Sequence, residues 1–157
     1  MKLLIVNNLA SGFGEGAIYD FVRSFVSDGD EVCIRSTDGT TDLASLLDNA
    51  SAYDAVIASG GDGTVAAVCY ELRYSNIPVL PFPAGTANIL TLNLASPLEP
   101  HALAKLGKSG QTLDLDLGEI EVADKTFGFA IMAGAGMPFS MVRALCIRII
   151  AQASGKK

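Results

Sequence analysis

Residues 55–72 read AVIASGGDGTVAAVCYEL. The stretch begins with a short apolar run, Ala55–Ala58, typical of a buried parallel strand, and ends in an apolar helix-like segment, Val65–Leu72. Between them, three glycines flank one carboxylate, Asp62. Glycines let the backbone approach a bulky anion, and a following helix directs its free N–H groups and the positive end of its dipole toward it. The stretch therefore predicts an anion site at the carboxyl end of a strand.

Asp62 makes this prediction more specific. A carboxylate beside a bound anion is favourable mainly when a divalent cation lies between the two. We therefore interpret Gly60–Thr64 as the outline of a nucleoside triphosphate site that includes a metal ion. The alternative is a tight turn capped by Asp62 and Thr64 that binds nothing, which is common for a short glycine-rich sequence.

The first hundred residues alternate between strand-like and helix-like patterns. We expect strands at residues 2–6, 31–35, 55–58 and 78–80, and helices at residues 18–26, 41–47, 65–74, 86–94 and 100–106. This alternation predicts an α/β fold, a parallel sheet with helices on both faces. Ligands bind at the carboxyl ends of the strands in such sheets. The loops Asn7–Gly16, Gly60–Thr64 and Pro83–Asn88 all follow strands and should therefore converge.

The pattern changes near Gly110. Leu113–Leu117 alternates apolar and acidic residues, Gly118 suggests a bend, and residues 119–122 and 126–133 predict an antiparallel hairpin. We therefore divide the chain into an α/β nucleotide-binding domain, residues 1–109, and an incomplete β-rich second domain, residues 110–157. Pro138–Ser154 predicts a C-terminal helix that is apolar on nearly every side and needs a cover. This helix would be buried either by further residues of a longer protein or by a second copy in a homo-oligomer formed through this segment.

Composition restricts the partners and the location. The chain has 157 residues, half of them hydrophobic, and a net charge of −6, which argues against nucleic acid as a partner. Three dispersed cysteines fit free thiols in a reducing cytoplasm, and no Cys/His cluster has metal-ligand spacing. We expect no signal peptide and no membrane span. Residues 137–157 carry four basic and no acidic residues. Peripheral association with the inner membrane face therefore stays open beside a plain cytoplasmic location.

Four features occur in a characteristic order: a strand ending at Asn7 with a Ser-Gly loop to Gly12, then Thr37, then Gly60–Thr64, then Pro83–Asn88. Together they resemble the catalytic domain of the diacylglycerol kinase family, including its bacterial lipid kinases. The resemblance covers roughly residues 1–136. It implies an α/β nucleotide-binding domain followed by a β-sandwich domain, with the active site between them.

The resemblance also implies a function: ATP-dependent phosphorylation of a lipid hydroxyl at a membrane surface, with Mg²⁺. Asp62 would be the metal ligand and the catalytic residue. The nucleotide would be bound by Asn7, Ser11, Gly12, Thr37, Gly60, Gly61, Asp62, Gly63, Thr64, Gly85, Thr86 and Asn88. None of the three loops contains a lysine, so the metal and backbone dipoles must supply most of the charge neutralisation.

The chain departs from the family pattern at several positions. Asn8 replaces a usual proline, Ala66 and Ala67 replace a common Asn-Glu pair, Ile89 replaces a frequent aspartate, and Pro138 lies where Asp-Ala commonly begins. The family's general base and part of its metal site lie further along the second domain. We expect this chain to lack that region, so its own activity is left open.

Two other functions remain as alternatives. NAD kinases share the sequence Gly-Gly-Asp-Gly-Thr, although the Asn-Glu pair missing here is usual in them and Pro83–Asn88 favours a lipid kinase. The chain could also be a non-catalytic nucleotide-binding or regulatory module. ATP binding without phosphorylation of any acceptor would distinguish that class.

Overall fold

The computed structural model describes residues 1–11, 16–122, 124–130 and 141–150, with only the backbone described at residues 122 and 141–146. The strands are β1 Lys2–Asn8, β2 Glu31–Thr37, β3 Ala55–Gly60, β4 Val79–Pro83, β5 Thr112–Val122, β6 Lys125–Phe129 and β7 Met141–Ile150. The helices are α1 Ala17–Phe25, α2 Leu43–Leu46, α3 Asp62–Glu71, α4 Ile89–Asn93 and α5 Pro100–Ser109, with a 3-10 turn at Ala50–Ala52.

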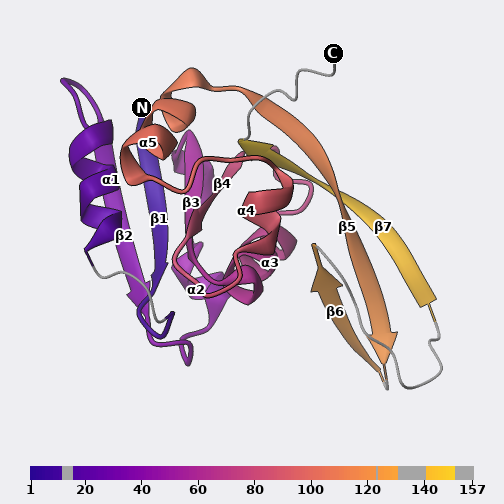
Figure 1. Cartoon of the computed structure of the whole chain (residues 1–157). Helices are drawn as coiled ribbons and strands as arrows, with labels where there is room; N and C mark the ends of the chain where they lie inside the picture. Colours follow the sequence, from indigo (N-terminus) through magenta and orange to yellow (C-terminus); the bar gives the residue numbers. More distant parts are fainter. Residues whose placement is uncertain (12–15, 123, 131–140, 151–157) are drawn as a thin grey trace, which may run out of the picture.

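The strands form one sheet in the order β2-β1-β3-β4-β7-β5-β6 (Figure 1). The first four strands are parallel to one another, and β7 joins them through a parallel pairing of Ile149 with Val79. β5 is antiparallel to both of its neighbours, β7 and β6. The expected α/β sheet is confirmed, and the described part of the chain extends it with antiparallel strands.

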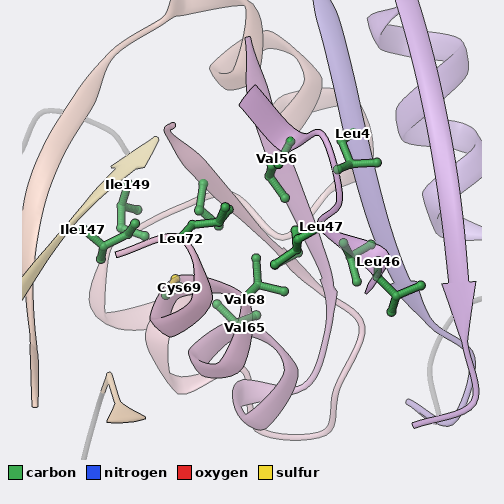
Figure 2. Close-up of a cluster of buried hydrophobic side chains, with 14 of the residues drawn as sticks. Leu4, Leu46, Leu47, Val56, Val65, Val68, Cys69, Leu72, Ile147 and Ile149 are labelled. Carbon is green, nitrogen blue, oxygen red and sulfur yellow. The ribbon is translucent and has the colours of Figure 1, made fainter. Parts of the chain in front are cut away.

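Helices cover both faces of the parallel region, as expected. On one face, Phe21 of α1 and Leu103 of α5 pack against Ile5 and Leu80 of the sheet. On the other face, the buried side of α3 packs against the sheet together with α2, as Figure 2 shows. The strands between these layers are buried on both sides, which explains why their sequences are almost continuously apolar.

The predicted helix at Pro138–Ser154 is wrong over the described residues 141–150, which form strand β7. Ile147 and Ile149 pack into the cluster around α3, whereas Ile150 packs into the cluster on the opposite face. Side chains alternate across a strand, so a strand covered on both faces is apolar on both sides, like the helix we expected. These isoleucines are buried by the chain itself and need no second copy to bury them, while a homo-oligomer through this segment stays a prediction. Residues 138–140 and 151–154 lie outside the described residues.

The predicted hairpin is confirmed as the antiparallel pair β5–β6, although residues 131–133 lie outside the description. Gly118, where we expected a bend, lies within β5 and is paired in unbroken register with β6 and β7. The ring of Phe129 packs over this glycine: a Cβ there would lie 2.0 Å from the ring, so a larger residue would require the ring to move. The antiparallel strands begin at Thr112 but share the sheet of the α/β part, and the boundary between residues 109 and 110 stays a prediction.

Two cysteine side chains are described, and both are free thiols, half-buried at Cys33 and buried at Cys69. Burial raises the pKa of Cys69 to about 12, so this thiol stays protonated and unreactive at neutral pH. The side chain of Cys146 lies outside the description. Within the described ranges, no helix has the length and apolar character needed to cross a membrane.

Asp30 ties α5 to the end of α1 and to β1. Its carboxylate accepts hydrogen bonds from the backbone N–H and hydroxyl of Ser27, at 2.8 and 2.7 Å, and from the Met1 amino group at 2.9 Å. It also pairs with the ammonium of Lys108, which lies 4.3 Å from the centroid of the Phe25 ring. Lys108, the Met1 amino group and Ser27 together hold the pKa of Asp30 well below its usual range.

We expect Asp30→Asn to lower the free energy of unfolding at neutral pH, because the variant loses a charge that these donors stabilise. The folded pKa lies below the unfolded value of about 3.9, so this stabilisation is fully present above about pH 5 and is lost as the pH falls further. Urea unfolding at pH 7 and at pH 3 should show a difference from wild type that shrinks in acid. Asp28→Asn, at an exposed neighbour, is the control. Equal effects of the two substitutions would contradict the assignment.

Candidate nucleotide-binding site

The carboxyl ends of the parallel strands lie level with one another. Asn7 of β1 pairs with Ser59 of β3, Gly60 of β3 pairs with Pro83 of β4, and the end of β2 pairs with the end of β1. The loops after β1, β3 and β4 therefore meet at one edge of the sheet, as the sequence predicts. Gly12 lies outside the described residues, so its position in this site is not tested.

Side-chain hydrogen bonds join the first loop to the Gly60–Thr64 loop. The backbone N–H of Gly61 donates to Ser11 Oγ at 3.2 Å, and Asn8 Nδ2 donates to Thr64 Oγ1 at 2.8 Å. Asn8 Oδ1 also accepts the N–H of Ala10 at 3.0 Å. Asn8 was not among the predicted site residues; the available signal was its amide side chain at the carboxyl end of a strand. It fixes the first loop to the start of α3.

Asn7 and Thr37 reach this edge but are buried and hydrogen-bonded within the protein. Asn7 Oδ1 accepts the hydroxyl of Ser59 at 2.8 Å, and Thr37 Oγ1 accepts the backbone N–H of Gly39 at 3.0 Å. Only 5% of Asn7 and 8% of Thr37 is exposed. These contacts hold the strand ends in shape, and direct contact of either residue with a nucleotide stays a prediction.

Asp62 is the first residue of α3 and is half-buried. Its Oδ1 accepts the backbone N–H of Leu90, in the first turn of α4, at 3.1 Å. This hydrogen bond orients the carboxylate and joins the start of α3 to the segment after β4. Asp62 therefore has a structural role in addition to the metal-binding role expected for it.

The Pro83–Asn88 loop is closed by its own side chain. Asn88 Oδ1 accepts the N–H of Gly85 at 3.0 Å, while Asn88 Nδ2 donates to the carbonyl of Gly85 at 2.7 Å. Asn88 has a φ of 49°, in the left-handed region that asparagine tolerates better than most residues. Thr86 lies exposed at the tip of this closed loop, where a ligand can reach it.

The glycines of the site divide into two groups. A Cβ on Gly60 would lie 2.5 Å from the Cβ of Thr64, and one on Gly85 would lie 2.4 Å from the Cα of Gly61. These two glycines are required for the loops to pack. By contrast, a Cβ on Gly63 would meet nothing within 4 Å, and one on Gly61 would make only an ordinary 3.6 Å contact. Glycine in a helix costs up to about 1 kcal/mol relative to alanine, so packing does not explain Gly63. A ligand lying against the start of α3 would.

The donor set fits a cation that arrives with phosphate. Among the residues described, no three His, Cys, Asp or Glu side chains come close enough together to hold a metal ion. Among the described residues of the three loops, Asp62 is the one carboxylate. Mg²⁺ is commonly bound through one or two carboxylates plus phosphate oxygens, and it keeps several waters. A single aspartate beside an open backbone fits that mode and does not fit a metal held by the protein alone.

A sheet of this order, with three linked loops at its carboxyl edge, defines an α/β protein of the kind whose ligands bind where the strands end. Residues 2–120 match the family model for the diacylglycerol kinase catalytic domain. The chain therefore belongs to the diacylglycerol kinase catalytic-domain family, which confirms the resemblance found in the sequence.

Individual relatives agree with this assignment. A "Probable lipid kinase YegS-like" protein of Pectobacterium atrosepticum is 29% identical over 156 residues, covering 92% of this chain and 52% of the relative. The protein of the same description in Yersinia enterocolitica is 31% identical over 140 residues, covering 85% and 46%. The crystal structure of a diacylglycerol kinase from Bacillus anthracis matches with a TM-score of 0.61 at 24% identity, covering 80% of this chain and 45% of that one, and shows the same fold. The chain thus spans about half the length of these relatives.

The two groups of glycines predict opposite effects on stability. Gly85→Ala should lower the free energy of unfolding by about 1–3 kcal/mol, because the new Cβ forces the two loops apart. Gly63→Ala should leave stability unchanged or raise it by up to about 1 kcal/mol, since alanine favours the helix and has free space. Urea unfolding of the two variants beside wild type measures both. A loss of stability in Gly63→Ala as large as that in Gly85→Ala would contradict the division.

Proposed function

We propose that this chain is the nucleotide-binding part of an ATP-dependent lipid kinase that uses Mg²⁺ and phosphorylates a lipid hydroxyl. The observation that carries the proposal is the open backbone at Gly63, beside Asp62, the one carboxylate among the described residues of the three loops. Membership of the family and the lipid kinase descriptions of the relatives support the reaction. The family match also favours a lipid kinase over an NAD kinase.

In this proposal the phosphates of ATP lie against the first turn of α3. The N–H groups of that turn and the helix dipole attract them, in place of a lysine. Asp62 holds Mg²⁺, which neutralises charge on the phosphates. Its bond to the N–H of Leu90 keeps the carboxylate in one orientation before the ligand arrives. Asn8 and Ser11 hold the loops in the geometry that the phosphates require.

The reaction is a transfer of the terminal phosphoryl group. The hydroxyl oxygen of the acceptor forms a bond to the γ-phosphorus while the bond from that phosphorus to the bridging oxygen breaks. ADP leaves, and the hydroxyl proton passes to a base. By the family resemblance that base lies further along the second domain. In this proposal the protein acts in the cytoplasm, at the inner face of the membrane where a lipid acceptor is within reach.

The test is calorimetric titration of Mg·ATP into the wild-type chain and into Asp62→Asn. We expect at least a 10-fold loss of affinity in the variant, because the metal loses a charged partner. The fold should survive, since Asn Oδ1 can still accept the Leu90 N–H; urea unfolding checks this. Glu71→Gln removes an equal charge from the far, exposed end of α3 and serves as the matched control.

Each outcome of that titration bears on the proposal. Tight Mg·ATP binding lost in Asp62→Asn and kept in Glu71→Gln supports it. Equal affinity in all three proteins removes Asp62 from the metal site. If the folded wild-type chain binds no Mg·ATP, the nucleotide-binding role itself is wrong for this chain.

A further inference from the structure

A pocket of about 220 Å³ lies directly beside Asp62. Its wall consists of Asp62, Gly63 and Ala66 from α3, Ile89 from α4, and residues 128–130 from the end of β6. Asp62 contributes the one polar side chain of this lining; the others are glycine, alanine, isoleucine and phenylalanine. The pocket therefore joins the carboxylate of the proposed metal site to an apolar surface.

The wall formed by β6 is held firmly against α3. A Cβ on Gly128 would lie 2.0 Å from the ring of Tyr70, so the ring packs directly on the strand backbone. The Tyr70 hydroxyl donates to Glu119 Oε2 of β5 at 3.0 Å, and the guanidinium carbon of Arg73 lies 3.9 Å from the ring centroid. These contacts fix the distance between α3 and β6, so the pocket exists before any ligand enters.

The size and lining of the pocket restrict what it can hold. An apolar cavity of about 150 Å³ admits a benzene-sized molecule, whereas pockets for whole drug-sized ligands have about 300–1,000 Å³. This pocket therefore has room for a short hydrocarbon segment and not for a complete lipid or a dinucleotide. A hydroxyl group held against the apolar part of the lining would have no polar side chain to bond, and burying an unpaired hydroxyl is unfavourable.

We infer that this pocket receives the hydrocarbon segment next to the acceptor hydroxyl and places that hydroxyl beside Asp62. The acceptor is then an alcohol whose neighbouring atoms are apolar, and a polyol is rejected. The inference rests on the proposed function, since it assigns the acceptor class of the same site. Ala66 and Ile89 determine this specificity. Both side chains are apolar, and the fold brings them into one wall.

Two matched probes test the inference: 1-hexanol and 1,6-hexanediol, which have the same chain length and differ by one distal hydroxyl. Each is titrated into the whole chain while the methyl signals of Ala66, Ala130 and Ile89 are followed by NMR. We expect saturable shifts with hexanol and an affinity about 10- to 100-fold lower for the diol, the range over which an apolar pocket rejects an added hydroxyl.

Substitutions then locate the binding. Ala66→Leu fills the pocket and should weaken hexanol binding at least 10-fold while Mg·ATP affinity stays within about 2-fold of wild type. Ala67→Leu adds the same side chain at the next, exposed position of α3, outside the pocket lining, and should change neither. Ala66→Ser serves as a second variant if leucine prevents folding, because it adds a hydroxyl with little volume and should also weaken hexanol binding.

The result that overturns the inference is a folded wild-type chain that binds Mg·ATP and shows no hexanol shifts at these methyl groups. Equal affinities for the two probes, or hexanol binding unchanged by Ala66→Leu, overturn it as well. Failure of the proposed function has a different signature, in which Mg·ATP does not bind but hexanol still occupies the pocket. That result removes the acceptor role and leaves an apolar binding site.

Discussion

The close passage of the Gly61 and Gly85 backbones is the contact on which the site depends. It is possible because β3 and β4 end level with each other, and because Gly85 has no Cβ, which would lie 2.4 Å from the Cα of Gly61. Once the two loops meet, the N–H of Leu90 comes within hydrogen-bond distance of Asp62 and orients its carboxylate. The first loop then attaches to the same unit through Asn8 and Ser11. A steric constraint therefore precedes the polar contacts that give the site its chemistry.

Polar side chains at this edge have two different tasks. Several are used inside the protein, among them Asn7 with Ser59 and Asn88 with the backbone of Gly85. Elsewhere at this edge the surface is open, because Gly63 and Thr86 are exposed to solvent. Loops that are already held by internal hydrogen bonds need not be ordered when a ligand binds, so less of the binding free energy is lost. The pocket wall is also held before a ligand binds, because Tyr70, near the end of α3, donates a hydrogen bond to Glu119 of β5.

Local patterns were sufficient to predict the α/β fold and the convergence of the loops, because strand ends and glycine turns are encoded by neighbouring residues. The segment Met141–Ile150 was misassigned, because an apolar run is compatible both with a buried helix and with a strand covered on two faces. Pairing with β4 and β5 makes this segment a strand, and those partners are distant in sequence. The contacts of the site glycines also come from residues distant in sequence, so the sequence could not distinguish Gly85, which is required for packing, from Gly63, which has free space around it. The hydrogen bond between Asn8 and Thr64 likewise joins residues far apart in the sequence and could not be predicted from it.

β7 comes last among the described strands, yet it lies inside the sheet between β4 and β5 (Figure 1). While the chain is being synthesised, β4 therefore lacks its neighbour β7 until residues 141–150 have left the ribosome. Over that interval β5 has only β6 beside it. Unpaired edges of apolar strands readily join other chains. A nascent chain that stalls before this segment therefore leaves β4 without its neighbour on that side.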